Sequence, residues 1–134
     1  MQRVLVATDS DQTFDEVDAA LAGSDTEVTR VRSGREVRRA VIEAEPELVV
    51  LDLQIGSMGG MAACMDLRLE ESGDRLDPQS ILLLLDRDAD VFIAERSGAD
   101  GWLIKPVDAG RLRRAAEALA RGERFDETGR TAVG

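Results

Sequence analysis

The chain has 134 residues, of which 43% are hydrophobic and 33% are charged, a balance typical of one globular domain with a hydrophobic core. Its 27 acidic residues outnumber the 17 basic ones and give a net charge of -10, which argues against direct binding to nucleic acid or an anionic membrane. There is no histidine, so imidazole chemistry is excluded, and no apolar stretch reaches the ~20 residues of a membrane span, so we expect a cytoplasmic protein.

Short apolar segments alternate with amphipathic ones along the chain. The amphipathic segments space their apolar residues three and four apart, as in Phe14, Val17 and Leu21, and predict helices. One of these helices carries the single cysteine, Cys64, on its apolar side, which predicts a buried thiol and no internal disulfide. The predicted strands are residues 3–7, 27–31, 48–52, 81–85 and 100–105. Such an alternation predicts a parallel sheet with helices on both faces.

Four charged residues lie at or just after the ends of predicted strands: Asp9, Asp52, Asp86 and Lys105. Because parallel strands end at the same edge of a sheet, we expect these side chains to converge. Clustered carboxylates favour a hard cation such as Mg²⁺, and a lysine can hold an anionic oxygen. This set suits phosphoryl transfer to an aspartate. The alternative is a structural rim in which Lys105 only offsets the charges of Asp9 and Asp52.

At this point the sequence resembles the receiver domain of two-component response regulators. The resemblance covers nearly the whole chain and depends on the order and spacing of five short pieces. They are VLVATD (residues 4–9), LVVLDL (48–53), Gly59-Gly60, GADGWL (98–103) and Lys105-Pro106. The resemblance implies a three-layer, flavodoxin-like (βα)5 sandwich whose five-stranded parallel sheet has the order 2-1-3-4-5. It places the receiver domain at residues 1–122 and a flexible tail at 123–134.

The resemblance also implies the roles of individual residues. Asp52 would be the phosphoacceptor, and Lys105 would contact the phosphoryl group. Asp9, Asp52 and the backbone carbonyl of Gln54 would hold a weakly bound Mg²⁺ or Mn²⁺. The Lys105–Pro106 peptide bond is expected to be cis.

The resemblance implies a signalling role through other proteins. A histidine kinase or phosphotransfer protein would supply the phosphoryl group, and the domain would catalyse its own phosphorylation and usually its dephosphorylation. The face formed by the fourth helix, fifth strand and fifth helix would bind a downstream protein or a second copy. Trp102 occupies the family's switch position beside this face, where an exposed indole would suit an interface. Asp86 and Pro106 are grouped with Trp102 as switch or interface residues. The residues after Gly122 are too few for a DNA-binding unit, so we expect a stand-alone receiver.

Three departures from the family pattern leave two interpretations open. Thr8 stands where one of two adjacent acidic residues is usual. Leu85 or Asp86 stands where a hydroxyl residue usually ends the fourth strand. The segment before Gly98 is about three residues short. In one interpretation Asp86 replaces the lost carboxylate at the metal, and Asp52 is still phosphorylated. In the other, the chain is a pseudo-receiver that binds a partner without phosphorylation.

A hypothesis from a different class concerns residues 9–13, DSDQT, which resemble the signature of haloacid-dehalogenase-type phosphatases. There Asp9 would be the nucleophile and Asp11 the general acid, with Lys105 and the pair Asp86 and Asp88 completing the site. The chain has little room for the cap that shapes the substrate pocket in that family, and this hypothesis leaves Asp52 without a role.

Overall fold

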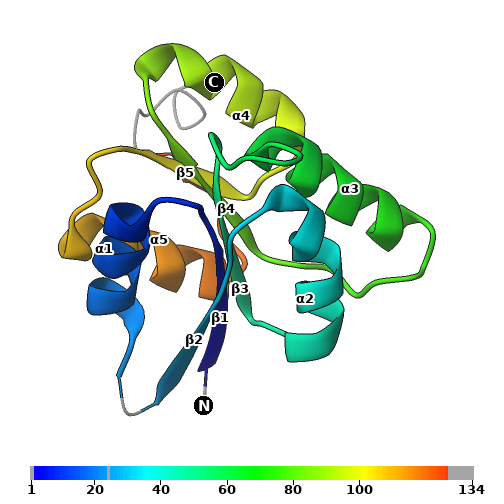
Figure 1. Ribbon diagram of the computed structural model, residues 1–134, viewed down its shortest axis with the longest axis horizontal. Coiled ribbons are helices and arrows are strands. Elements are labelled where there is room, and N and C mark those ends of the chain that lie inside the picture. Colours follow the sequence, from blue (N-terminus) through cyan, green and yellow to red (C-terminus); the bar gives the residue numbers. More distant parts are fainter. Residues whose placement is uncertain (1, 24, 127–134) are drawn as a thin grey trace.

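The computed structural model describes residues 2–23 and 25–126 and forms a three-layer α/β sandwich (Figure 1). The strands are β1 (Gln2–Ala7), β2 (Thr26–Val31), β3 (Leu48–Asp52), β4 (Ile81–Leu85), β5 (Gly101–Ile104) and β6 (Phe125–Asp126). The α-helices are α1 (Asp11–Leu21), α2 (Val37–Ala44), α3 (Gly60–Ser72), α4 (Val91–Ser97) and α5 (Ala109–Ala120). Single turns of 3-10 helix, η1 (Gly34–Glu36) and η2 (Asp88–Asp90), precede α2 and α4.

All strand pairs are parallel, and the sheet order is β2-β1-β3-β4-β5-β6. The first five strands have the expected order, but the expected number of strands was wrong. A sixth strand, Phe125–Asp126, pairs with Gly101 and Trp102 of β5 and now forms that edge of the sheet. A strand of two residues is too short for the alternation of apolar and polar residues that a sequence pattern needs. The rest of the expected tail, residues 127–134, lies outside the described residues.

The helices divide between the two faces of the sheet. Helices α1 and α5 pack against each other on one face, while α2, α3 and α4 cover the other (Figure 1). Every residue of β3 and β4 is buried, as the continuous apolar runs predict. Cys64 on α3 is also fully buried. Among the described residues, no helix combines the length and apolar character needed to cross a membrane.

The loop after β3 is held by a close approach to η1. The backbone N–H groups of Gly34 and Arg35 donate to the carbonyl oxygens of Gly56 and Ser57, at 3.1 and 3.0 Å. A Cβ atom on Gly34 would lie 1.5 Å from the carbonyl oxygen of Met58, so only glycine fits there. The contact keeps this loop beside the carboxyl end of β3, where Asp52 lies.

Candidate functional site

Asp52, the last residue of β3, is 2% exposed, and both of its carboxylate oxygens accept hydrogen bonds. Oδ1 accepts from the Lys105 ammonium at 2.8 Å and from the backbone N–H of Gln54 at 3.1 Å. Oδ2 accepts from the hydroxyl of Thr8 at 2.7 Å. A buried carboxylate requires such donors, because an unpaired buried charge is strongly unfavourable.

The sheet order explains why these residues meet. Thr8 directly follows β1, the neighbour of β3, and its backbone N–H still bonds to Val31 of β2 at 3.1 Å. Lys105 follows β5, two strands from β3 on the other side, and its long side chain spans the end of β4. The Lys105–Pro106 peptide bond is cis. The carboxyl ends of β1, β3 and β5 therefore contribute one side chain each to the site.

Lys105 is shared between two carboxylates. Its ammonium donates to Oδ1 of Asp86 at 3.2 Å as well as to Asp52. Partial burial by itself lowers the pKa of Lys105, but the hydrogen bonds and charges of Asp52 and Asp86 outweigh it and raise the pKa above its usual value. Lys105 thus remains cationic at neutral pH and partly neutralises an acidic cluster.

The metal ligands expected from the sequence are only partly brought together. Asp9 is exposed, and its Oδ2 accepts from the backbone N–H of Gly56 at 3.1 Å. Within the described part of the chain, no group of three or more acidic, cysteine or histidine side chains is arranged to hold a metal ion. Asp9, Asp52 and the Gln54 carbonyl offer oxygen ligands of the kind Mg²⁺ prefers. Because Mg²⁺ keeps several of its waters when it is bound, this small number of protein ligands is sufficient.

Trp102 does not have the exposed position that an interface would favour. Its side chain is 1% exposed, and its indole N–H donates to Oδ1 of Asp126 on β6 at 3.0 Å. The additional strand explains the difference, because β6 covers the edge of β5 on which Trp102 lies. Pro106, by contrast, is exposed at the site's rim.

Two residues of this region were missed or misjudged from the sequence. Thr8 was taken as a lost carboxylate, whereas its hydroxyl is a hydrogen-bond donor to Asp52. Asp90 was not considered. It is 2% exposed and accepts from the backbone N–H groups of Asp86 and Arg87, at 3.2 and 3.0 Å. A local Asp-x-Asp pattern after an apolar run is the only signal that could have suggested this turn.

The end of β4 carries no hydroxyl. Leu85 is fully buried and pairs with Ile104 of β5, so the first side chain at the rim is Asp86. Asp86 contacts Lys105. The rim therefore presents a carboxylate beside the lysine where the family pattern usually has a hydroxyl residue, and of the two candidates, Leu85 and Asp86, it is Asp86 that lies there.

The geometry argues against the phosphatase hypothesis. Asp11 pairs with Arg30 and Arg32 at 2.9 and 3.2 Å. The hydrogen bonds from Arg30 and Arg32 lower the pKa of Asp11, which keeps it ionised and unsuited to protonate a leaving group. Asp11 thus lacks the acid function that this mechanism requires.

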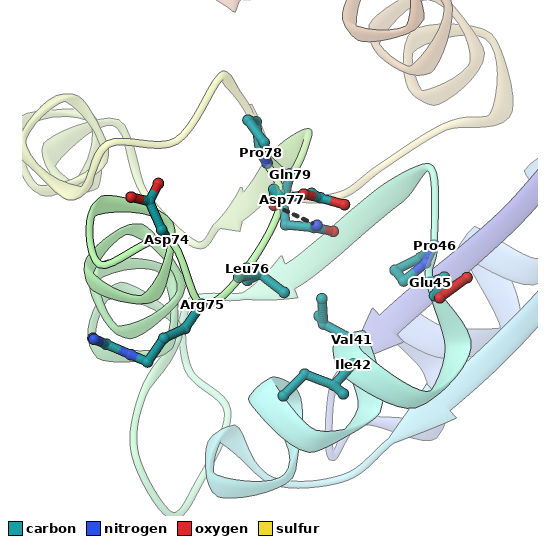
Figure 2. Close-up of a pocket in the computed structure, with 10 residues that line it drawn as sticks. All are labelled: Val41, Ile42, Glu45, Pro46, Asp74, Arg75, Leu76, Asp77, Pro78 and Gln79. Atoms are coloured by element: carbon teal, nitrogen blue, oxygen red, sulfur yellow. Dashed lines mark hydrogen bonds between the residues drawn. The ribbon is translucent and has the colours of Figure 1, made fainter.

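A cavity of about 450 Å³ lies beside the segments that precede β3 and β4 (Figure 2), whereas Asp52 lies at the carboxyl end of β3. Val41 and Ile42 of α2 face Leu76 across it, and Pro46 and Gln79 precede β3 and β4. None of the strand-end residues Asp9, Asp52, Asp86 and Lys105 lines it. This cavity is not part of the candidate site.

Comparison with known proteins identifies the class that this fold and site define. A family model described as the response regulator receiver domain matches residues 4–117. The chain therefore belongs to the receiver domain family of two-component response regulators. Phosphorylation on aspartate and binding of Mg²⁺ are typical of this family, and its members interact with histidine kinases.

Similar proteins include full-length regulators and isolated receivers. The chain is 32% identical over 127 residues to the transcriptional regulatory protein AfsQ1 of Streptomyces coelicolor, covering 92% of this chain and 54% of that protein. It is 30% identical over 126 residues to the DNA-binding response regulator MtrA of Mycobacterium tuberculosis, covering 94% of this chain and 53% of MtrA. The chain thus spans about half the length of these curated relatives.

A solved structure shows the same fold. The signal receiver domain of a signal transduction histidine kinase from Syntrophus aciditrophicus superposes with a TM-score of 0.78 at 26% identity. The match covers 91% of this chain and 92% of that one.

Membership of the receiver family also removes the basis for the haloacid-dehalogenase hypothesis.

Proposed function

We propose that Asp52 accepts a phosphoryl group from a histidine kinase or a phosphotransfer protein, and that the domain passes this signal to protein partners. The observation that carries the proposal is the paired carboxylate of Asp52. It lies at the carboxyl end of a central strand, with the Lys105 ammonium 2.8 Å from one oxygen and the Thr8 hydroxyl 2.7 Å from the other.

The proposed step breaks the N–P bond of a phosphohistidine and forms an O–P bond to an oxygen of Asp52. The donor imidazole leaves with the electron pair of the broken bond. Lys105 would then offer its ammonium to the transferred oxygens, whose negative charge it offsets. The Thr8 hydroxyl would keep the carboxylate oriented by donating to its other oxygen.

A divalent ion would supply the remaining positive charge when bound. We propose that Asp9, Asp52 and the backbone carbonyl of Gln54 hold Mg²⁺ or Mn²⁺ weakly, with waters completing the coordination. Asp86 is assigned a different role from the metal ligand considered in the sequence analysis. Because it contacts Lys105, we propose that it restrains the lysine and opposes the incoming phosphoryl charge.

We further propose that this chain is a cytoplasmic receiver that acts by binding other proteins. MtrA is described as DNA-binding and AfsQ1 as a transcriptional regulator, but the chain matches only about half of each protein. The net charge of -10 argues against a direct role of these residues in binding nucleic acid. We therefore propose that the partner is a downstream protein or a second copy of this chain.

The test is phosphorylation of the chain by acetyl phosphate, followed by intact-mass spectrometry at increasing Mg²⁺ concentrations. We expect a mass gain of one phosphoryl group that depends on Mg²⁺ and disappears in Asp52→Asn. Asp74→Asn, which changes an exposed carboxylate far from the site, is the matched control and should be phosphorylated as the unmodified chain is.

The same experiment distinguishes a phosphorylated receiver from a pseudo-receiver. A pseudo-receiver would take up no phosphoryl group at any Mg²⁺ concentration, and that result would refute the proposal. Uptake that survives Asp52→Asn would refute the assignment of the acceptor residue.

A further inference from the structure

The edge strand β5 is covered by a short segment of the same chain, which we call the latch segment and define as residues 123–126. Gly122, at φ 78°, ends the turn after α5 and redirects the chain toward β5. Phe125 and Asp126 then pair in parallel with Gly101 and Trp102. The backbone N–H of Phe125 donates to the carbonyl oxygen of Asp100 at 3.0 Å.

Three side-chain contacts accompany this pairing and favour particular residue types at the edge of β5. The indole N–H of Trp102 donates to the carboxylate of Asp126 at 3.0 Å. Phe125 is half-buried and packs against the core cluster beneath α1 and α5. The guanidinium of Arg124 lies 5.9 Å from the centre of the Trp102 ring, within reach of a cation–π contact.

Gly101 makes the edge accessible to another backbone. A Cβ atom at Gly101 would lie 2.8 Å from the carbonyl oxygen of Phe125 and 3.0 Å from its Cβ. The absence of a side chain therefore allows a strand to approach β5 directly. An edge strand with unpaired N–H and C=O groups is a ready site for strand addition, and backbone pairing supplies much of the affinity.

We propose that the β5 edge is a strand-docking surface, that the latch segment is its resident occupant, and that a partner must displace this segment to bind. The partner that fits is an extended peptide running parallel to β5, with an apolar residue followed by a carboxylate. The apolar residue would take the place of Phe125, and the carboxylate would accept from Trp102. This inference does not depend on phosphorylation of Asp52.

The short length of the latch segment makes displacement feasible. Among the described residues, two residue pairs join β5 and β6, and the tether to α5 raises the effective concentration of this short strand. A competing peptide has to overcome the effective concentration that the tether provides. A longer strand, or one delivered by a bound partner protein, meets this condition.

The test uses Trp102 as a reporter, because it is the single tryptophan of the chain. In the unmodified chain, Trp102 should be poorly quenched by acrylamide, since it is 1% exposed. We expect Asp126→Ala to increase the quenching constant, and Phe125→Ala with Asp126→Ala to increase it severalfold. Glu123→Ala is the matched control. It alters the same segment at a residue that pairs with Arg121 and lies outside β6, and it should leave quenching unchanged.

A rescue experiment tests the docking surface itself. The hexapeptide Arg-Gly-Glu-Arg-Phe-Asp, the sequence of residues 121–126, is added at millimolar concentration to the double variant. We expect it to restore the low quenching of Trp102, whereas a peptide with alanine in place of Phe and Asp does not. The unmodified chain should not respond, because its latch segment occupies the edge.

Two results would overturn the inference. If Asp126→Ala and the double variant are folded by circular dichroism and show the quenching of the unmodified chain, the latch segment does not hold Trp102. If Trp102 is readily quenched in the double variant and the peptide does not reduce this quenching, the edge is not a docking surface. Should the double variant fail to fold, both measurements are made on Asp126→Ala, which changes a half-exposed side chain: its quenching tests the latch segment, and the fall in quenching when the hexapeptide is added tests the docking surface.

Discussion

The ammonium of Lys105 lies 2.8 Å from Oδ1 of Asp52 and 3.2 Å from Oδ1 of Asp86, so one cation serves two carboxylates. Removing one carboxylate should change what the lysine can do for the other. In Asp86→Ala, Lys105 is free to follow a phosphoryl group on Asp52, and one repelling charge is lost. Solvent screening reduces this repulsion to about 1 kcal/mol, which corresponds to a roughly fivefold larger equilibrium constant for phosphorylation.

Intact-mass spectrometry with acetyl phosphate measures this change as the phosphorylated fraction at steady state. Asp88→Ala removes an exposed carboxylate two residues away and serves as the control. Equal gains in both variants would mean that general surface charge, rather than the contact with Lys105, is responsible.

Thr8 should contribute to stability through its hydroxyl. Thr8→Val keeps the shape of the side chain but leaves Oδ2 of Asp52 without its 2.7 Å donor in a buried place. We expect the free energy of unfolding to fall by about 1–3 kcal/mol, the cost of an unsatisfied buried polar group. Urea denaturation followed by circular dichroism gives this value. Thr8→Ser retains the hydroxyl donor, so its free energy of unfolding should fall much less. Equal decreases in the two variants would contradict the assigned hydrogen bond.

Cys64 should react slowly in the folded chain. Burial raises the pKa of its thiol to about 11, and its Sγ lies 3.4 Å from the carbonyl oxygen of Ser97. The reactive thiolate is therefore scarce at pH 8 and becomes more abundant as the pH rises toward this pKa. A chromogenic disulfide reagent should label the native chain slowly at pH 8 and the urea-unfolded chain rapidly. Fast labelling of the folded chain at pH 8 would show that the thiol is accessible.

Gly60 should tolerate no side chain. A Cβ atom there would lie 2.6 Å from the carbonyl oxygen of Asp52 and 2.8 Å from the Cα of Leu53. Gly60→Ala must therefore displace either α3 or the end of β3, and we expect a loss of about 1–3 kcal/mol in the free energy of unfolding. At Gly59 the nearest atom would be 3.5 Å away, so Gly59→Ala is the matched control. Thermal melts of the two variants should differ clearly, and similar melts would show that α3 adjusts easily.

Much of the fold could be predicted because its signals are local. The continuous apolar runs that form β3 and β4 are recognisable without any partner, and both strands are completely buried. The order of the first five strands came from the family resemblance and agrees with the sheet. The two-residue strand β6 was missed, because its formation depends on the bare edge at Gly101 rather than on a pattern of its own.

The candidate site, like the fold, could be predicted only in part. Residues at strand ends were predicted to converge, and Asp52, Lys105 and Asp86 do lie within hydrogen-bond reach along one rim. The donor role of Thr8 could not be read from the sequence, which gives a residue type but not the direction of its hydroxyl. The burial of Trp102 was missed for a related reason, since the carboxylate that accepts from its indole lies 24 positions later.

The sequence by itself determined the family, the alternation of strands and helices, and which charged residues lie at strand ends. These properties depend on residue type and spacing along the chain. Only the tertiary structure decided that Thr8 and Lys105 divide the two oxygens of Asp52, that Asp86 shares the lysine, and that β6 covers Trp102. Each of these contacts joins segments that are distant in the chain, and their geometry exists only once the sheet has brought the strand ends together.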